Sequence, residues 1–156
     1  MHKSPILAAI LFALLFAVGE MWLSPAHAKD NGSWLDDPKI AFGQAKKDNK
    51  LVLLDFTGST WCPTCQAMHK EVFSTKKFKD YAQQFVLLRV DFPDPQSVPQ
   101  KGAPMVEKYL KGDIELPTIL ILSPDGKKLG ETSYKPGGPD VFISDVDKIA
   151  KKKVGR

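Results

Sequence analysis

Cysteine and histidine are scarce in this chain, and their scarcity restricts the chemistry that it can perform. Two cysteines occur among 156 residues, which excludes a scaffold held together by several structural disulfides. Two of the three histidines lie within the first 28 residues, so His69 is the one histidine of the remainder. Structural zinc sites use four ligands, whereas Cys62, Cys65 and His69 offer three. A structural zinc site is therefore not expected.

A strong net charge and a membrane-spanning apolar run are also missing. The net charge is +4, and the lysines are spread along the chain except for the cluster Lys151-Lys152-Lys153. That cluster lies where the last helix is expected to end, and lysines there complement the helix dipole. The apolar run Ile6 to Val18 has 13 residues, fewer than the roughly 20 that span a bilayer core. We therefore expect no nucleic-acid partner and no stable membrane span after processing.

The N-terminus is typical of an export signal. His2 and Lys3 precede the apolar run, and the segment ends in Ala26-His27-Ala28, the A-x-A pattern of a signal-peptidase site. We expect residues 1–28 to be a cleaved signal peptide and the protein to be periplasmic or otherwise exported. The remaining residues, 29–156, are enough for a single compact domain.

Apolar runs that alternate with amphipathic segments predict an α/β fold, with a central mixed sheet flanked by helices and a helix ahead of the first strand. Strands are predicted at Leu51–Phe56, Phe85–Phe92, Pro117–Leu122 and Lys127–Tyr134. Five helices are predicted. The first begins at Asp37-Pro38, the second includes Cys65 to Val72, the third includes Phe78 to Ala82, the fourth spans Met105–Lys111 and the last includes Phe142 to Ile149. The segment Pro93 to Pro104 is predicted to be irregular. The first two strands should be joined by a right-handed parallel crossover.

Cys62 and Cys65 are separated by two residues, directly after a predicted strand and at the start of a predicted helix. A disulfide ring this small restricts the unfolded chain very little, so redox chemistry is favoured over a stabilising role. At a helix N-terminus, free backbone N–H groups and the dipole favour the thiolate. Cys62 is therefore the predicted nucleophile and Cys65 the resolving thiol. Pro63 fits the first helical turn, where its missing N–H is tolerated.

Two further residues stand out against their surroundings. Asp55 is a lone carboxylate in an apolar run, where burial would raise its pKa and let it exchange a proton with a nearby cysteine. Pro117 interrupts a strand-like run, which indicates an edge, a strand start or a cis peptide bond. His69 follows Cys65 by one helical turn and is interpreted as a solvated helix residue.

Together these elements closely resemble the thioredoxin-like fold. The segment Leu51 to Cys65, L-V-L-L-D-F-T-G-S-T-W-C-P-T-C, resembles exported bacterial thioredoxin-family proteins with an F-T-G-S-x-W-C-x-x-C motif, and residues 115–118 supply E-L-P-T. The resemblance covers nearly all of residues 29–156. It implies that Cys62 attacks and Cys65 resolves, that Trp61 is part of the surface beside the disulfide, and that Asp55 is the buried aspartate. It further implies a cis-proline at Pro117, with the Leu116 backbone available to pair with an extended substrate.

The sequence departs from thioredoxin at two places. The loop from Asp55 to Cys62 is one residue longer, which bears on the proton-transfer role of Asp55. The Pro63-Thr64 pair replaces Gly-Pro and resembles the Cys-Pro-x-Cys of glutaredoxins and of some periplasmic oxidases. Because those relatives act in different redox directions, this pair does not determine the direction of electron flow.

The leading hypothesis is an exported thiol–disulfide oxidoreductase that acts on protein substrates, with reduction favoured. It would need no cofactor beyond the Cys62–Cys65 disulfide, and a second protein would recycle that pair. The roughly twenty residues before Leu51 leave no room for the dimerisation domain of an isomerase, so a monomer is expected. The alternatives are an oxidase that introduces disulfides, or a copper or zinc carrier that uses Cys62, Cys65 and His69.

Overall fold

The computed structural model describes residues 33–111 and 114–151. The predicted signal peptide, residues 1–28, lies outside the described residues, as does most of the C-terminal lysine cluster. Within the described ranges, no helix is long and apolar enough to cross a membrane.

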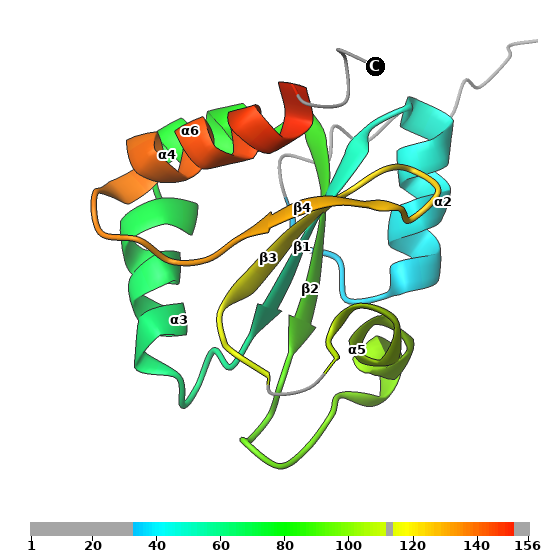
Figure 1. Cartoon of the computed structure of the whole chain (residues 1–156), viewed down its shortest axis with the longest axis vertical. Coiled ribbons are helices and arrows are strands. Elements are labelled where there is room, and N and C mark those ends of the chain that lie inside the picture. The colour runs from blue at the N-terminus through cyan, green and yellow to red at the C-terminus, as the bar shows by residue number, and fades with distance from the viewer. Residues whose placement is uncertain (1–32, 112–113, 152–156) are drawn as a thin grey trace, which may run out of the picture.

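The centre of the molecule is a four-stranded mixed sheet with the order β2-β1-β3-β4 (Figure 1). Strand β1 (Leu51–Thr57) pairs in parallel with β2 (Phe85–Asp91) and antiparallel with β3 (Thr118–Leu122). Strand β3 then pairs antiparallel with β4 (Lys128–Thr132). All four strands were predicted, and the mixed sheet is confirmed; β4 is shorter than the predicted Lys127–Tyr134.

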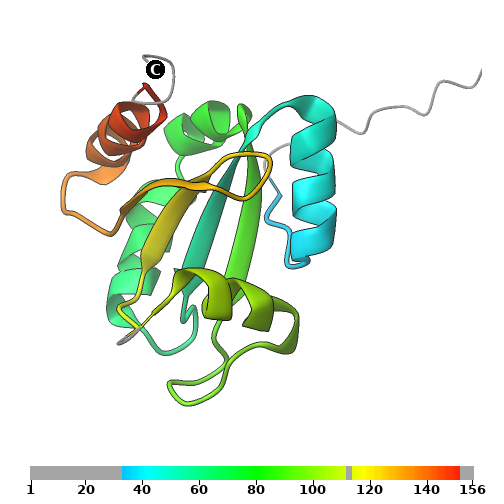
Figure 2. The same cartoon turned by 45° about the vertical axis from the view of Figure 1, so that its right-hand side comes forward.

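Helices cover both faces of the sheet, which gives three layers. Helices α2 (Pro38–Asp48) and α5 (Ala103–Tyr109) lie on one side, and α3 (Pro63–Met68), α4 (Lys76–Ala82) and α6 (Gly138–Lys151) lie on the other (Figure 1 and Figure 2). Successive side chains of a strand point to opposite faces. Val52, Leu54 and Phe56 accordingly join the core under α2 and α5, whereas Leu53 joins the core under the other three helices. The same alternation directs Asp55 toward the α3 side.

Two helices differ from the prediction in their bounds. The helix predicted to carry Cys65 to Val72 is α3 followed by a π-helical turn, η1 (His69–Phe73), and Cys65, Met68 and Val72 are all buried as expected. The segment after Pro93 is irregular as far as a 3₁₀ turn, η2 (Gln100–Gly102), which leads into α5. Helix α5 begins at Ala103, two residues before the predicted start, because Pro104 is tolerated in a first turn.

The residues before α2 close the outer edge of β2. Leu35 forms an isolated parallel bridge with Leu88, with hydrogen bonds from Leu35 N to Leu87 O (2.9 Å) and from Arg89 N to Leu35 O (2.8 Å). Asp37 then caps α2 by accepting from Lys39 N at 2.8 Å, as the sequence predicted. This N-terminal segment therefore brings Trp34 beside Arg89 on β2.

Candidate active site

The two cysteines form a disulfide at the start of α3, where the chain leaves the C-terminal end of β1. Their Cα atoms are 5.2 Å apart. Cys62 is the N-cap residue of α3 and Pro63 is in the first turn, so the predicted helix start is confirmed. Both cysteines are buried, with 5% and 3% of their surfaces exposed. Exposure therefore does not distinguish Cys62 from Cys65, and any difference between the two sulfurs must come from the groups around them.

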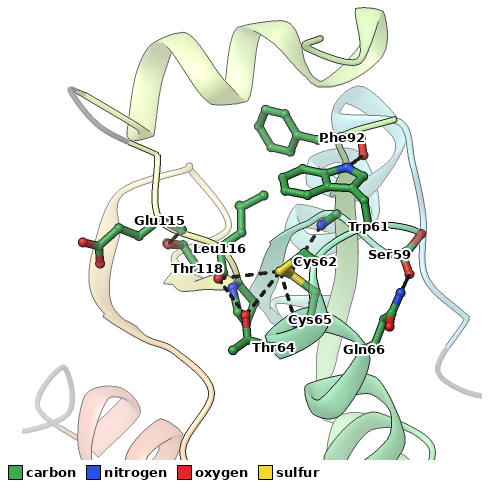
Figure 3. The surroundings of a disulfide bond; sticks show 12 residues. Ser59, Trp61, Cys62, Thr64, Cys65, Gln66, Phe92, Glu115, Leu116 and Thr118 are labelled. Carbon is green, nitrogen blue, oxygen red and sulfur yellow. Dashed lines mark hydrogen bonds between the residues drawn. A yellow bond between two sulfur atoms is a disulfide. The ribbon is translucent and has the colours of Figure 1, made fainter. Parts of the chain in front are cut away.

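The Cys62 sulfur faces α3 and the segment that precedes β3. Its Sγ accepts a hydrogen bond from Cys65 N at 3.3 Å and lies 3.3 Å from Thr64 Oγ1 (Figure 3). The Leu116 carbonyl oxygen lies 3.8 Å from the same sulfur and accepts from Thr64 Oγ1 at 3.2 Å. Thr64, Leu116 and Cys62, all named from the sequence, therefore meet at one point. Donors directed at Sγ stabilise a thiolate there.

The segment beside Cys62 is held on both sides. The peptide bond between Leu116 and Pro117 is cis, in agreement with the resemblance. The Ser133 hydroxyl donates to Pro117 O at 2.6 Å, and the Thr118 hydroxyl donates to Glu115 O at 2.5 Å. Pairing of β3 with β1 begins at Thr118, so Leu116 precedes the sheet and its backbone is not part of the ladder.

Trp61 closes another side of the site. Its Nε1 donates to Phe92 O at 2.9 Å (Figure 3), and its ring packs over Gly58. A Cβ atom at Gly58 would lie 2.5 Å from Trp61 Cε2, a distance that requires the ring to move. Gly58 also donates its backbone N–H to Cys65 Sγ at 3.5 Å. Sequence reasoning did not identify Gly58, although a glycine in the F-T-G-S segment was visible.

The lengthened loop between β1 and α3 is tied down by side chains that the sequence did not reveal. Ser59 N and Ser59 Oγ donate to the two carboxylate oxygens of Asp91, at 2.9 and 2.5 Å. Gln66 Nε2 donates to Ser59 O and to Thr60 O at 3.3 and 3.1 Å. The extra residue therefore lies in a loop with defined anchors on β2 and α3. The contact with Asp91 has no local signal in the sequence, because Asp91 is more than thirty residues away from Ser59.

Cys65 borders a cavity of about 260 Å³ between β1, β2 and α3. Asp55, Arg89 and His69 are among the residues that line it. Asp55 is 1% exposed, and its Oδ2 accepts from Arg89 Nε at 3.2 Å. Among the described residues, Asp55 Oδ1 has no hydrogen-bond partner. Asp55 and Cys65 therefore border one cavity, as a proton exchange between them would require.

Burial raises the pKa of Asp55 to about 6, although the Arg89 guanidinium opposes this shift, and the nearby charge of Asp91 adds to it. Arg89 is directly opposite Asp55 in the parallel pairing of β1 and β2, and its guanidinium lies 4.4 Å from the centre of the Trp34 ring. Sequence reasoning missed Arg89. The available signal was a lone cation in the apolar strand Phe85–Phe92, which matches the lone anion in the neighbouring strand.

A metal site is not assembled in the part of the chain that the structure describes. No group of three or more histidine, cysteine, aspartate or glutamate side chains there could hold a metal ion. His69 is exposed at the start of η1, in agreement with its interpretation as a solvated helix residue, and both cysteines are joined to each other.

The fold and this pair of cysteines define a class of protein. A family profile described as Thioredoxin-like matches residues 33–124. The chain belongs to the thioredoxin-like family and is a thiol–disulfide oxidoreductase.

Individual members of the family are similar to this chain over most of its length. The chain is 29% identical over 116 residues to "Disulfide bond reductase DsbH" of Chlamydia pneumoniae, an alignment that covers 71% of this chain and 69% of the relative. A solved structure titled "DsbH Oxidoreductase" superposes with a TM-score of 0.66 and 28% identity, covering 76% of this chain and 84% of that one. The chain is also 26% identical over 127 residues to "Thioredoxin-related protein DsbJ" of Chlamydia pneumoniae, covering 77% of this chain but only 36% of the longer relative.

Proposed function

We propose that this chain is an exported reductase of protein disulfides, in which Cys62 attacks the substrate and Cys65 resolves the mixed disulfide. The observation that supports these roles most directly is the different surroundings of the two sulfurs. Cys62 Sγ faces Thr64 and the Leu116 carbonyl, beside backbone that is free of the sheet. Cys65 instead borders the cavity that it shares with Asp55.

In the first step, the Cys62 thiolate of the reduced protein attacks one sulfur of a substrate disulfide. A bond forms between Cys62 Sγ and that sulfur, the substrate S–S bond breaks, and the other substrate sulfur leaves as a thiolate that takes a proton from solvent. The helix N-terminus favours the Cys62 thiolate through the N–H of Cys65. An extended substrate pairs with the backbone near Leu116.

In the second step, Cys65 loses its proton and attacks Cys62 Sγ. The Cys62–Cys65 disulfide forms, the mixed disulfide breaks, and the second substrate sulfur leaves as a thiol once protonated. Asp55 is positioned to accept the Cys65 proton through the shared cavity. A carboxylate whose pKa is about 6 is a stronger base than an ordinary aspartate and is still mostly ionised at pH 7.

Each cycle leaves the protein oxidised by two electrons, so a second protein must reduce Cys62–Cys65 again. We propose that this partner is a dithiol protein, because thiol–disulfide exchange then returns both electrons and both protons without a further cofactor. Residues 1–28 would direct the chain out of the cytoplasm before it meets either partner. The mature protein, residues 29–156, would act as a monomer.

The direction of electron flow is supported by the relative named a disulfide bond reductase. An oxidase is the alternative, because Cys-Pro-x-Cys also resembles some periplasmic oxidases. The reduction potential of the Cys62–Cys65 pair, measured against glutathione buffers, separates the two. We expect a value near that of thioredoxin, about −270 mV, whereas a value near −120 mV would identify an oxidant. Metal analysis of the reduced protein tests the carrier alternative, which requires stoichiometric copper or zinc.

A further inference from the structure

The hydroxyl of Thr64 lies between two acceptors that both take part in exchange. Its Oγ1 is 3.2 Å from the Leu116 carbonyl oxygen and 3.3 Å from Cys62 Sγ (Figure 3). A threonine hydroxyl has one proton to donate, so a full hydrogen bond to one acceptor leaves the other without it. Because both acceptors are already within reach, rotation about the Cβ–Oγ1 bond is enough to exchange them.

In the disulfide form, this proton belongs on the Leu116 carbonyl. A disulfide sulfur carries no proton, so Cys62 Sγ cannot donate to Thr64 Oγ1, and its 3.8 Å approach to Leu116 O is not a hydrogen bond. Neutral sulfur is a weak acceptor, whereas a backbone carbonyl is a strong one. The hydroxyl therefore holds the Leu116 carbonyl while the disulfide is closed.

Reduction reverses this preference. The Cys62 thiolate carries a full negative charge, and hydrogen bonds to ionised acceptors are roughly twice as strong as neutral ones. The N–H of Cys65 already points at the same sulfur from 3.3 Å. Turning the Thr64 hydroxyl to Sγ adds a second donor to the thiolate and removes the donor from the carbonyl.

The carbonyl that is released lies where a substrate backbone can reach it. Leu116 is half-buried and precedes the first residue of β3 that pairs with β1. Its neighbours Ile114 and Glu115 are exposed, and Thr64 is exposed on the other side. An extended polypeptide can add to such a segment through main-chain hydrogen bonds.

We propose that the Thr64 hydroxyl couples the redox state of Cys62 to substrate docking at Leu116. This inference rests on the proposed function and deepens it. In the reduced protein, the hydroxyl stabilises the Cys62 thiolate and leaves the Leu116 carbonyl free for the backbone of a disulfide-containing polypeptide. In the oxidised protein, the hydroxyl takes one of the two lone pairs of the carbonyl oxygen, competes there with an N–H of the product and so weakens its hold. The coupling favours cycles that bind oxidised substrate and release reduced product.

The first test is the pH dependence of iodoacetamide alkylation of Cys62 in the full reduced chain. Thr64→Val keeps the shape of the side chain and removes the proton, while Thr64→Ser keeps the hydroxyl. We expect the alkylation midpoint of Thr64→Val to lie about one pH unit above that of the wild type, equivalent to a tenfold loss of thiolate stabilisation. Thr64→Ser should stay close to the wild type. Equal midpoints for valine and serine would overturn the proposal.

The second test measures docking without exchange. The probe is a capped, extended ten-residue peptide in which both cysteines of a substrate disulfide are replaced by serine, and its affinity is measured for the reduced and oxidised protein. We expect the wild type and Thr64→Ser to bind it about tenfold more tightly when reduced, and Thr64→Val to bind it equally in both states. A redox-dependent affinity that persists in Thr64→Val would overturn the coupling.

These outcomes are separable from the proposed function itself. If the wild type reduces protein disulfides but Thr64→Val keeps the wild-type midpoint and redox-dependent affinity, the coupling is wrong and the reductase assignment stands. If the wild type has the potential of a strong oxidant while Thr64→Val still removes the redox-dependent affinity, the coupling stands and the assigned direction is wrong.

Discussion

The two sides of the disulfide differ in what surrounds each sulfur far more than in how deeply each is buried. Cys62 and Cys65 are 5% and 3% exposed, yet Cys62 faces a hydroxyl and a carbonyl at the rim of the molecule. Cys65 receives the N–H of Gly58 and borders the cavity of Asp55 and Arg89. We propose that these two identical side chains, three residues apart, acquire separate tasks from their neighbours.

The largest expected difference is the rate at which the two thiols are alkylated in the reduced protein. At pH 6.5, we expect iodoacetamide to modify Cys62 about 100-fold faster than Cys65, because Cys62 is the N-cap residue, where the helix N-terminus favours the thiolate, whereas Cys65 is buried within α3. Peptide mapping by mass spectrometry reads the order directly. Equal rates, or faster modification of Cys65, would remove the distinction between the two sides.

On the Cys65 side, Asp55→Asn should change how stability depends on pH. Burial raises the Asp55 pKa from 3.8 to about 6, so between these values the folded state keeps a proton that the unfolded state has lost. As pH rises from about 4 to about 6, the free energy of unfolding of the wild type therefore falls by about 3 kcal/mol relative to that of Asp55→Asn. Above about pH 6, the difference between the two proteins stays constant. Urea denaturation at several pH values measures it; parallel curves for both proteins would show that Asp55 titrates normally.

Gly58→Ala tests the loop that joins the two sides. The added Cβ would lie 2.5 Å from the Trp61 ring, so the ring must shift, and we expect a loss of about 2 kcal/mol in the free energy of unfolding. Gly43→Ala in α2 is the matched control, because nothing lies within 4 Å of its Cβ. That change should stabilise by about 0.5–1 kcal/mol, since alanine favours helix. A neutral Gly58→Ala would mean that the contact with Trp61 is easily relieved.

The smallest effect is expected from Trp61→Phe on the Cys62 side. This change removes the 2.9 Å hydrogen bond to Phe92 O but keeps a ring over Gly58. We expect a loss of about 1 kcal/mol in urea denaturation, with the alkylation order of the two cysteines unchanged. A reversed order would mean that the tryptophan, rather than Thr64 and the helix N-terminus, distinguishes Cys62.

The side facing Cys62 was largely predictable from the sequence, and the side facing Cys65 was predictable in part. The residue pattern indicated the strands, the N-cap position of Cys62 and the break at Pro117, because strand periodicity, helix capping and proline geometry are local properties. Asp55 was identified by its mismatch with an apolar strand. Its partner Arg89 lies on another strand, and nothing local specifies which strands become neighbours.

The lengthened loop illustrates the same limit. The sequence shows that the loop has one extra residue, but its anchors are Asp91, Gln66 and Phe92, which meet it only after the sheet and α3 have formed. The position of the Thr64 hydroxyl between two acceptors depends likewise on a contact with Leu116, 52 residues away. Contacts between residues far apart in the sequence therefore required the structure, even where the residues themselves had been named, whereas features of local geometry did not.

The most direct test of the separate tasks is to trap the mixed disulfide in two matched variants. Reduced Cys65→Ser and Cys62→Ser are incubated with a protein that contains an exposed disulfide, and the products are mapped by mass spectrometry. We expect Cys65→Ser to accumulate a stoichiometric mixed disulfide through Cys62, because no resolving thiol remains, and Cys62→Ser to accumulate none. A mixed disulfide through Cys65 in Cys62→Ser, with none in Cys65→Ser, would contradict this expectation.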